Sequence, residues 1–302
     1  MPENRASIGG QAVIEGVMMR SPTAYATAVR TPQGRIVIKK VPYRSLVRRF
    51  KPLNIPVVRG AITLVETLYI GVQSLTYSAS QAVDETPDTK SRGRVATNLA
   101  LTGSVVLALG MGFVLFFYVP LLLTEILGFE SGVVFNLVDG VFRLGIFLLY
   151  VFLISRWKEM RRIFQYHGAE HMTIYTYESG EELTTERASR QPRLHPRCGT
   201  SFLIVVMLVS IVVFVFMGRP ETIGDRLLRF AMIPLIGGIS YEFIRLSAKE
   251  RFRKMFGPAV WPGLALQRIT TQPPTEEMLE VAIAALEACR DHQAVRLQVP
   301  AS

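Results

Sequence analysis

The chain has 302 residues, of which 49% are hydrophobic, and it carries a formal net charge of +10 at pH 7. Its mean hydropathy of +0.29 and the grouping of its apolar residues into long blocks argue against an ordinary water-soluble domain. Its 2 cysteines lie far apart, which argues against a disulfide framework. Its 4 histidines are too few for a histidine-box di-iron enzyme, and the sequence contains no glycine-rich phosphate loop or nucleophile elbow.

Strand character marks the first region, residues 1–54. The runs Gln11–Arg20 and Tyr25–Arg30 are rich in Val, Ile, Met and Thr, and the turn Thr31–Gly34 follows, so we expect a hairpin. Glu15 is the one carboxylate in its apolar run, and alternation along a strand would turn it toward water. We expect a β-rich cytoplasmic region with no cleavable signal peptide, because no uninterrupted apolar segment opens the chain.

The next segment, residues 55–80, is apolar but has a polar seam. Arg59, Glu66 and Gln73 recur every seven residues and would share one side of a helix. A full membrane crossing here would place the later basic segments on the unexpected side of the membrane. We therefore predict an interfacial or re-entrant helix, followed by a polar linker over residues 81–97.

Four apolar blocks then predict a mainly α membrane protein with about four transmembrane helices. The first, Leu99–Leu123, has no charged residue and exceeds the ~20 residues that a spanning helix needs. The others are Val133–Ile154, Phe202–Met217 and Phe230–Leu246. Helices 1 and 2 occupy residues 98–155, and helices 3 and 4 occupy residues 201–247.

Residues 156–200, between the second and third spans, contain a metal-site signature. His167, Glu170 and His171 form an H-x-x-E-H pattern, and on a helix these positions share one face. In the inverted zinc-hydrolase motif of this form, the imidazoles hold the metal and the carboxylate activates a water. His195 and Cys198 follow, and both are residue types that zinc prefers. The sequence therefore predicts a zinc site, although an isolated motif of this length also arises by chance and Cys198 could be an ordinary buried residue.

The C-terminal region, residues 248–302, is predicted to be cytoplasmic and to carry an amphipathic helix. Thr275 is a suitable N-cap and acidic residues fill the first turn. Apolar residues recur on one side of this helix at Leu279, Ile283 and Leu286.

Charge placement predicts the orientation. Basic residues cluster before the first span, after the second and after the fourth, at Arg92, Arg94, Arg156, Lys158, Arg161, Arg162, Lys249, Arg251, Arg253 and Lys254. The positive-inside rule then places both termini and the metal segment in the cytoplasm of a multi-pass inner (plasma) membrane protein. The loop 218–229 is an exception, because it also carries arginines. The excess basic charge favours contact with anionic lipids of the bilayer, and no aromatic-interleaved basic motif indicates nucleic acid.

Four segments resemble the YqhQ family of bacterial membrane proteins. They are Gly9–Arg20, Tyr166–His171, His195–Phe202 and Val281–Leu286, and the resemblance covers nearly the whole chain. That family is described as predicted metal-dependent enzymes, so the resemblance implies a metal and leaves the reaction open.

The resemblance also has consequences for single residues. The family's glycine-rich start implies that Glu15 and Arg20 belong to the working site, which makes Glu15 a candidate catalytic residue beside its simpler role as a strand residue. Met172 departs from the family, in which we expect lysine; it adjoins the motif but should not bind the metal.

The first hypothesis is a zinc hydrolase at the cytoplasmic membrane face, with peptide or lipid-linked substrates both open. His167 and His171 bind zinc or another divalent metal, His195 or Cys198 completes the set, and Glu170 acts as general base. In one alternative all four ligands close a structural zinc site in a scaffold or assembly factor. A homo-oligomer is left open.

A transporter is the other alternative, since ionisable groups in spans are often functional. The candidates are Asp139 with Arg143 and Glu242 with Arg245. Because each acid has a base three or four residues away, neutralising pairs are the simpler explanation.

Overall fold

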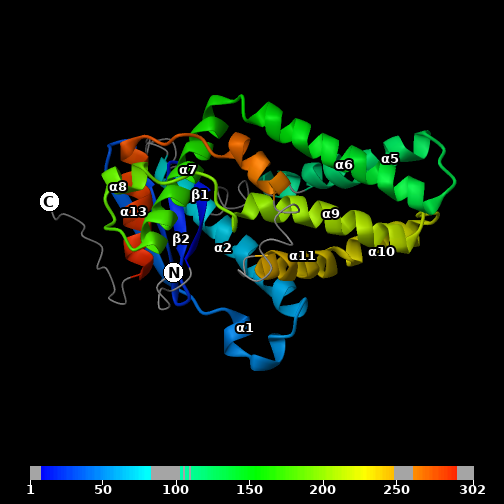
Figure 1. The fold of residues 1–302 in the computed structure, drawn as a ribbon, viewed down its shortest axis with the longest axis horizontal. Coiled ribbons are helices and arrows are strands. Elements are labelled where there is room, and N and C mark those ends of the chain that lie inside the picture. The colour runs from blue at the N-terminus through cyan, green and yellow to red at the C-terminus, as the bar shows by residue number, and fades with distance from the viewer. Residues whose placement is uncertain (1–7, 83–102, 105, 109, 248–260, 291–302) are drawn as a thin grey trace.

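The computed structural model describes residues 8–82, 103–104, 106–108, 110–247 and 261–290. Helices predominate, and a small antiparallel sheet lies near the N-terminus, as the sequence predicts. Figure 1 shows the sheet and its covering helices at one end of the molecule and the long apolar helices extending away from it. Most of the predicted linker and the basic residues before the first and after the fourth span lie outside the described residues.

The sheet is a four-stranded meander. Its strands are β1 (Gly9–Val13), β2 (Gly16–Arg20), β3 (Ala24–Arg30) and β4 (Ile36–Pro42), each antiparallel to the next. The predicted run Gln11–Arg20 is therefore a hairpin in itself. Glu15 is not a strand residue, because it occupies the tight turn between β1 and β2 with a φ of 53°.

Both faces of the sheet are covered by helices. Val17 and Met19 of β2 belong to a core with α7 (Lys158–Ser179) and α13 (Glu276–Arg290). On the opposite face, Met18 packs with Ile70 of α2 (Val58–Ala82). Thr27 also donates a hydrogen bond to Ser74 of α2, at 3.1 Å. Because side chains alternate along each strand, the sheet packs against helices on both of its faces. Helix α13 is the C-terminal helix that the sequence predicts.

Among the residues that the structure describes, four helices are long and apolar enough to cross a membrane, by length and composition. They are Val106–Ile126, which includes a π-helical turn at Val114–Tyr118 and α5 (Val119–Ile126), then α6 (Gly132–Ile154), α9 (Gly199–Met217), and Ile223–Ser247, which comprises α10 (Ile223–Ala231) and α11 (Ile233–Ser247). The last begins seven residues before the predicted Phe230. A capping box between Thr222 and Asp225 starts α10 at this earlier point.

Charged residues inside these helices have partners. Arg143 donates to Asp139 at 2.8 Å, as predicted. Arg229 donates to Asn136 at 2.7 Å, and Arg226 pairs with Glu125 at 2.5 Å. Arg226 and Arg229, which the sequence placed in a loop, therefore lie in α10 and are held by polar groups of neighbouring helices.

The helix α2 joins the two parts of the molecule. Its beginning crosses α11 at Gly60, where a Cβ would lie 2.8 Å from the carbonyl oxygen of Gly238. The three residues of its polar seam have different surroundings. Arg59 pairs with Glu242 of α11 at 2.5 Å, whereas Glu66 is buried and Gln73 is exposed. Glu66 accepts hydrogen bonds from the residues that open α1 (Leu46–Arg49), which leads through a 3-10 turn (Lys51–Leu53) toward α2.

Candidate metal centre

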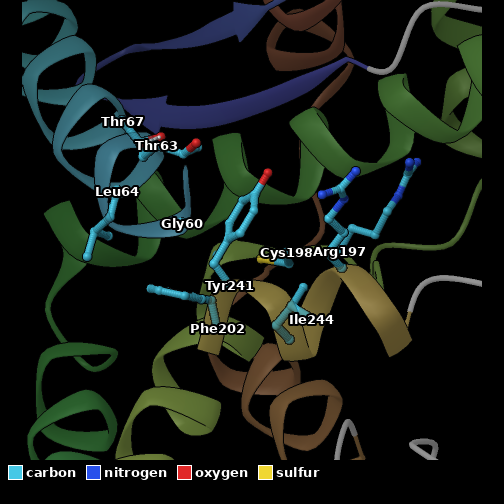
Figure 2. Close-up of a pocket in the computed structure, with 11 residues that line it drawn as sticks. Gly60, Thr63, Leu64, Thr67, Arg197, Cys198, Phe202, Tyr241 and Ile244 are labelled. Carbon is cyan, nitrogen blue, oxygen red and sulfur yellow. Dashed lines mark hydrogen bonds between the residues drawn. The ribbon is translucent and has the colours of Figure 1, made fainter. Parts of the chain in front are cut away.

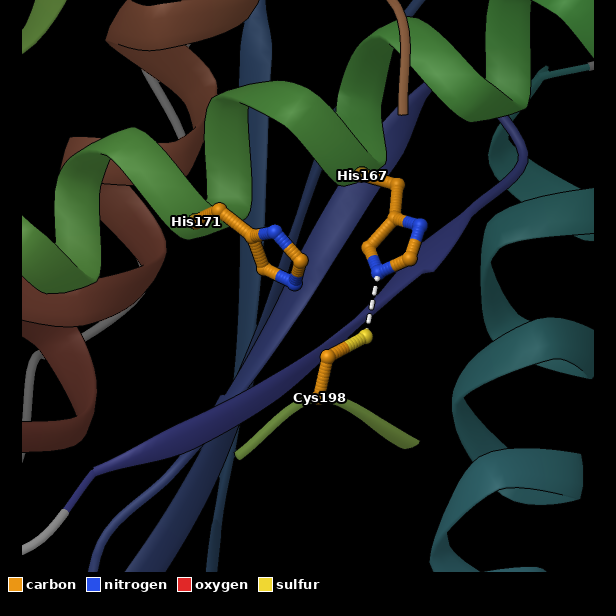
Figure 3. A group of neighbouring side chains, drawn as sticks. All are labelled: His167, His171 and Cys198. Atoms are coloured by element: carbon orange, nitrogen blue, oxygen red, sulfur yellow. Dashed lines mark hydrogen bonds between the residues drawn. The ribbon is translucent and has the colours of Figure 1, made fainter. Parts of the chain in front are cut away.

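Helix α7 presents His167, Glu170 and His171 on one face, as their spacing predicts. Cys198 faces them as the N-cap of α9. One ligand atom each from His167, His171 and Cys198 lies within 4.8 Å of the other two. Figure 3 shows both imidazole rings reaching from α7 toward the Cys198 side chain.

Hydrogen bonds fix which nitrogen of each ring is available. The Nδ1 atom of His167 lies 2.8 Å from the carbonyl oxygen of Thr270, and Nδ1 of His171 bonds to the carbonyl of Arg193. A carbonyl only accepts, so each Nδ1 carries the hydrogen and each Nε2 is left with its lone pair. Histidines that bind metals are usually held in this way. The Nε2 atom of His167 lies 3.1 Å from Sγ of Cys198.

Burial keeps His171 neutral, which metal binding requires. Its side chain is buried, and this desolvation lowers the pKa of the imidazole. The nearby His167 lowers that pKa further, whereas the hydrogen bond with Cys198 raises it.

Glu170 lies beneath the first strand. The backbone N–H of Gly10 donates to its carboxylate, and a Cβ at position 10 would lie 2.8 Å from both Cγ and Oε1 of Glu170. Only glycine therefore fits over this carboxylate. Burial raises the pKa of Glu170 to about 7, against the opposing effects of His167 and the Gly10 hydrogen bond.

His195 lies beside the group of three and has other partners. Its ring centroid is 5.7 Å from that of His171, and its Nε2 is 3.6 Å from a carboxylate oxygen of Glu178. Arg197 also pairs with Glu178. Although burial opposes it, the interactions with His195 and Arg197 lower the pKa of the Glu178 carboxyl. In this structure His195 therefore lies beside the ion pair of Glu178 and Arg197, next to the candidate metal centre.

Glu15 and Arg20, which the family resemblance implied as site residues, do not lie at the candidate metal centre. Glu15 pairs with Arg162 near the beginning of α7, and the hydroxyl of Tyr166 lies 3.4 Å from its carboxylate. Arg20 reaches the opposite face of the sheet, where it lies 3.5 Å from Glu66 of α2. The sharp β1–β2 turn and the strand alternation direct these side chains elsewhere.

Two cavities meet at Cys198. The smaller, of about 200 Å³, is lined by Ile8, Gly9, Gly10, Glu170, His171, Ile174, His195, Arg197, Cys198 and Gly199. The larger, of about 510 Å³, lies between α2, α9 and α11 (Figure 2). Arg197, Cys198 and Gly199 line both. The larger cavity therefore borders the candidate metal centre at Cys198.

Comparison with known proteins assigns the family. The family described as "Protein of unknown function (DUF1385)" matches residues 55–292. The chain is also 32% identical over 284 residues to "Uncharacterized protein YqhQ" of Bacillus subtilis (strain 168), which covers 91% of this chain and 89% of that protein. The chain belongs to this family. The resemblance drawn from its motifs is thus confirmed, and no solved structure matches the chain.

The donor set of this family member fits a zinc ion. Imidazole nitrogens and thiols are atom types that bind zinc, and three protein ligands would leave one position of a tetrahedral site open. Charge also fits, because a helix N-terminus favours a negative group such as a metal-bound thiolate at Cys198.

Sequence reasoning missed the groups that support these ligands. The carbonyls of Arg193 and Thr270 are backbone atoms, so their residue types give no signal. Gln267 bonds both the N–H and the carbonyl of His195, at 2.7 and 2.9 Å, and thereby fixes the loop before Cys198. The sequence marked Gly10 only as one of two adjacent glycines and gave no sign of its contact with Glu170. Met172 is buried in the core and lies away from the centre.

Proposed function

We propose that this protein is a membrane-embedded, zinc-dependent hydrolase. The observation that supports it is the convergence of His167, His171 and Cys198 on one point beside a cavity that also contains the buried Glu170. Three ligands and an adjacent carboxylate are the composition of a catalytic zinc site with an open position.

The chain's own residues would divide the chemistry. A zinc ion held by the three ligands would supply Lewis-acid activation of water and of a substrate carbonyl or phosphoryl group. Glu170 would accept a proton from a water in the cavity and return it to the leaving group, a role that typically contributes ~10²–10⁴-fold. The cover provided by Gly10 keeps bulk water away from this carboxylate.

The test is Glu170→Gln, which keeps the shape of the side chain and removes its basicity. We expect loss of function in complementation of a deletion strain, with stoichiometric zinc retained in the purified protein. Glu159→Gln, at an exposed position in the first turn of the same helix, is the control and should behave as wild type. Loss of zinc in Glu170→Gln would make Glu170 a ligand, and retained function would remove it from the mechanism.

The second candidate is a structural zinc site in a scaffold or assembly factor. The nearness of His195, whose ring centroid is 5.7 Å from that of His171, supports it, because a modest rotation would add a fourth ligand. Retention of zinc in His195→Ala would argue for the open site.

We infer that the protein is a multi-pass inner-membrane protein with both termini in the cytoplasm. We also infer that its basic end contacts anionic lipids. Arg156 and Arg161 lie at the junction of α6 with α7, on the side of the candidate centre. At the opposite end Arg219 donates to the carbonyl of Phe129 at 3.0 Å, and Arg226 and Arg229 of α10 pair with Glu125 and Asn136. These three arginines are held within the protein and stand as the exception to the positive-inside pattern.

A further inference from the structure

We propose that the 510 Å³ cavity beside Cys198 binds the apolar chain of an anionic amphiphile, and that this amphiphile is the substrate class of the enzyme. The binding step stands on the cavity alone, whereas the assignment as substrate rests on the proposed hydrolase function.

The walls of the cavity are suited to an apolar chain. Leu64 of α2, Phe202 of α9 and Ile244 of α11 contribute apolar surface to it (Figure 2). Its volume falls within the about 300–1,000 Å³ that is typical of ligand pockets. Transfer of an apolar chain into such a space is favoured by the removal of hydrocarbon from water.

The position of the cavity favours an amphiphile over a water-soluble peptide. Phe202 lies in the first turn of α9 and Ile244 in the last turn of α11, and both helices are long and apolar enough to span a membrane. The cavity therefore lies where the candidate spans meet the sheet and α7. A molecule whose chain is in the bilayer would reach it without leaving the interface.

The polar rim favours an anionic head group. Arg197 and Arg245 line the cavity together with the hydroxyl-bearing Tyr241. Arg245 lies 4.0 Å from Glu242, but that carboxylate is bound by Arg59 at 2.5 Å. Arg59 and Arg245 thus share one carboxylate, whereas the charge of Arg197 is paired with Glu178. The excess positive charge of the rim therefore lies at Arg245, where a phosphate or carboxylate head group would neutralise it.

The candidate centre is adjacent to this cavity, since Cys198 lines both this cavity and the smaller one, which Glu170 also lines. A chain bound between α2, α9 and α11 would leave its head group next to the metal ligand. Figure 2 shows Arg197 beside Cys198 at this place.

The experiment uses the full-length protein in liposomes that contain phosphatidylglycerol with a photoreactive acyl chain, or phosphatidylcholine with the same chain. Mass spectrometry of the labelled peptides locates the attachment. We expect saturable labelling of cavity-lining residues, at least several-fold stronger with the anionic lipid. Equal labelling by both lipids, or labelling that excess unlabelled phosphatidylglycerol does not compete away, would overturn the proposal.

Variants on α11 provide the structural control. Ile244→Trp fills the cavity and should reduce the labelling several-fold, whereas Leu246→Trp, two residues away and outside the lining, should leave it unchanged. Thr63→Trp fills the cavity from α2 and replaces the first variant if that variant does not fold. Arg245→Gln should reduce the difference in labelling between phosphatidylglycerol and phosphatidylcholine. Unchanged labelling in correctly folded Ile244→Trp and Thr63→Trp would also overturn the proposal.

Zinc content separates this proposal from the proposed function. All four variants should keep the zinc content of the wild type, because none of these side chains is a candidate ligand. Specific labelling in a protein that binds no zinc would refute the hydrolase and leave lipid binding intact. Stoichiometric zinc without specific labelling would refute the amphiphile and leave the hydrolase intact.

Discussion

His167, His171 and Glu170 are each supported by a residue that is distant in the sequence. His167 and His171 use carbonyls of Thr270 and Arg193 to hold one tautomer, and Gly10 covers Glu170. Such supports orient ligands and tune their basicity. The contact of Gly10 with Glu170 links the glycine-rich start to the candidate centre, whereas a catalytic role for Glu15 stays a prediction.

Gly10→Ala tests this contact. A Cβ at position 10 would lie 2.8 Å from Glu170 and from the backbone oxygen of Met18, so the strand or the carboxylate must move. We expect a loss of about 1–3 kcal/mol in the free energy of unfolding, the usual range for overpacking, together with impaired function. Gly9→Ala is the matched control, because nothing lies within 4 Å of a Cβ there. Denaturation of the detergent-purified proteins measures both; equal stability of the two variants would contradict the predicted contact.

At the scale of elements, Cys198 has two roles. It begins α9, where its sulfur accepts a hydrogen bond from the backbone N–H of Thr200 at 3.4 Å, and it faces the histidines of α7. Zinc binding here would tie a candidate membrane span to the helix that covers the sheet.

Cys198→Ser and His195→Ala separate these roles. Serine is a good N-cap and a poor zinc ligand, so Cys198→Ser should preserve α9 and lower zinc affinity by at least tenfold. His195→Ala should retain one zinc per chain, because Nε2 of His195 pairs with Glu178. Competition with a chromogenic chelator measures the affinities, and circular dichroism checks the helix content. A zinc loss in His195→Ala as large as in Cys198→Ser would favour a closed, structural site.

Across the whole molecule, the sequence predicted the classes of elements better than their contacts. Helical spacing placed His167, Glu170 and His171 on one face, and hydropathy located the four long helices. The packing of α2 against the sheet was not predicted, because its polar seam serves unrelated neighbours. Backbone carbonyls and the turn at Glu15 were also missed, since they depend on where distant segments meet.

Orientation is tested by engineered cysteines. Ser131, whose side chain makes no cap hydrogen bond, lies before α6, and Glu182 lies in the exposed segment after α7. An impermeant thiol reagent on intact cells should label Ser131→Cys and spare Glu182→Cys, while both react in permeabilised cells. Native Cys198 and Cys289 are buried and give a low background. The reverse pattern would place the candidate centre outside the cytoplasm.

The bond between His167 and Thr270 bears on how the protein is made. All three candidate ligands have been synthesised by residue 198, but the carbonyl that fixes the His167 tautomer comes 72 residues later, after the last candidate span. During biosynthesis the ligands therefore exist before the centre is ordered. In a nascent or truncated chain that ends before Thr270, the His167 ring would lack this hydrogen bond. If the centre binds zinc, full zinc affinity would therefore mark chains whose assembly is complete.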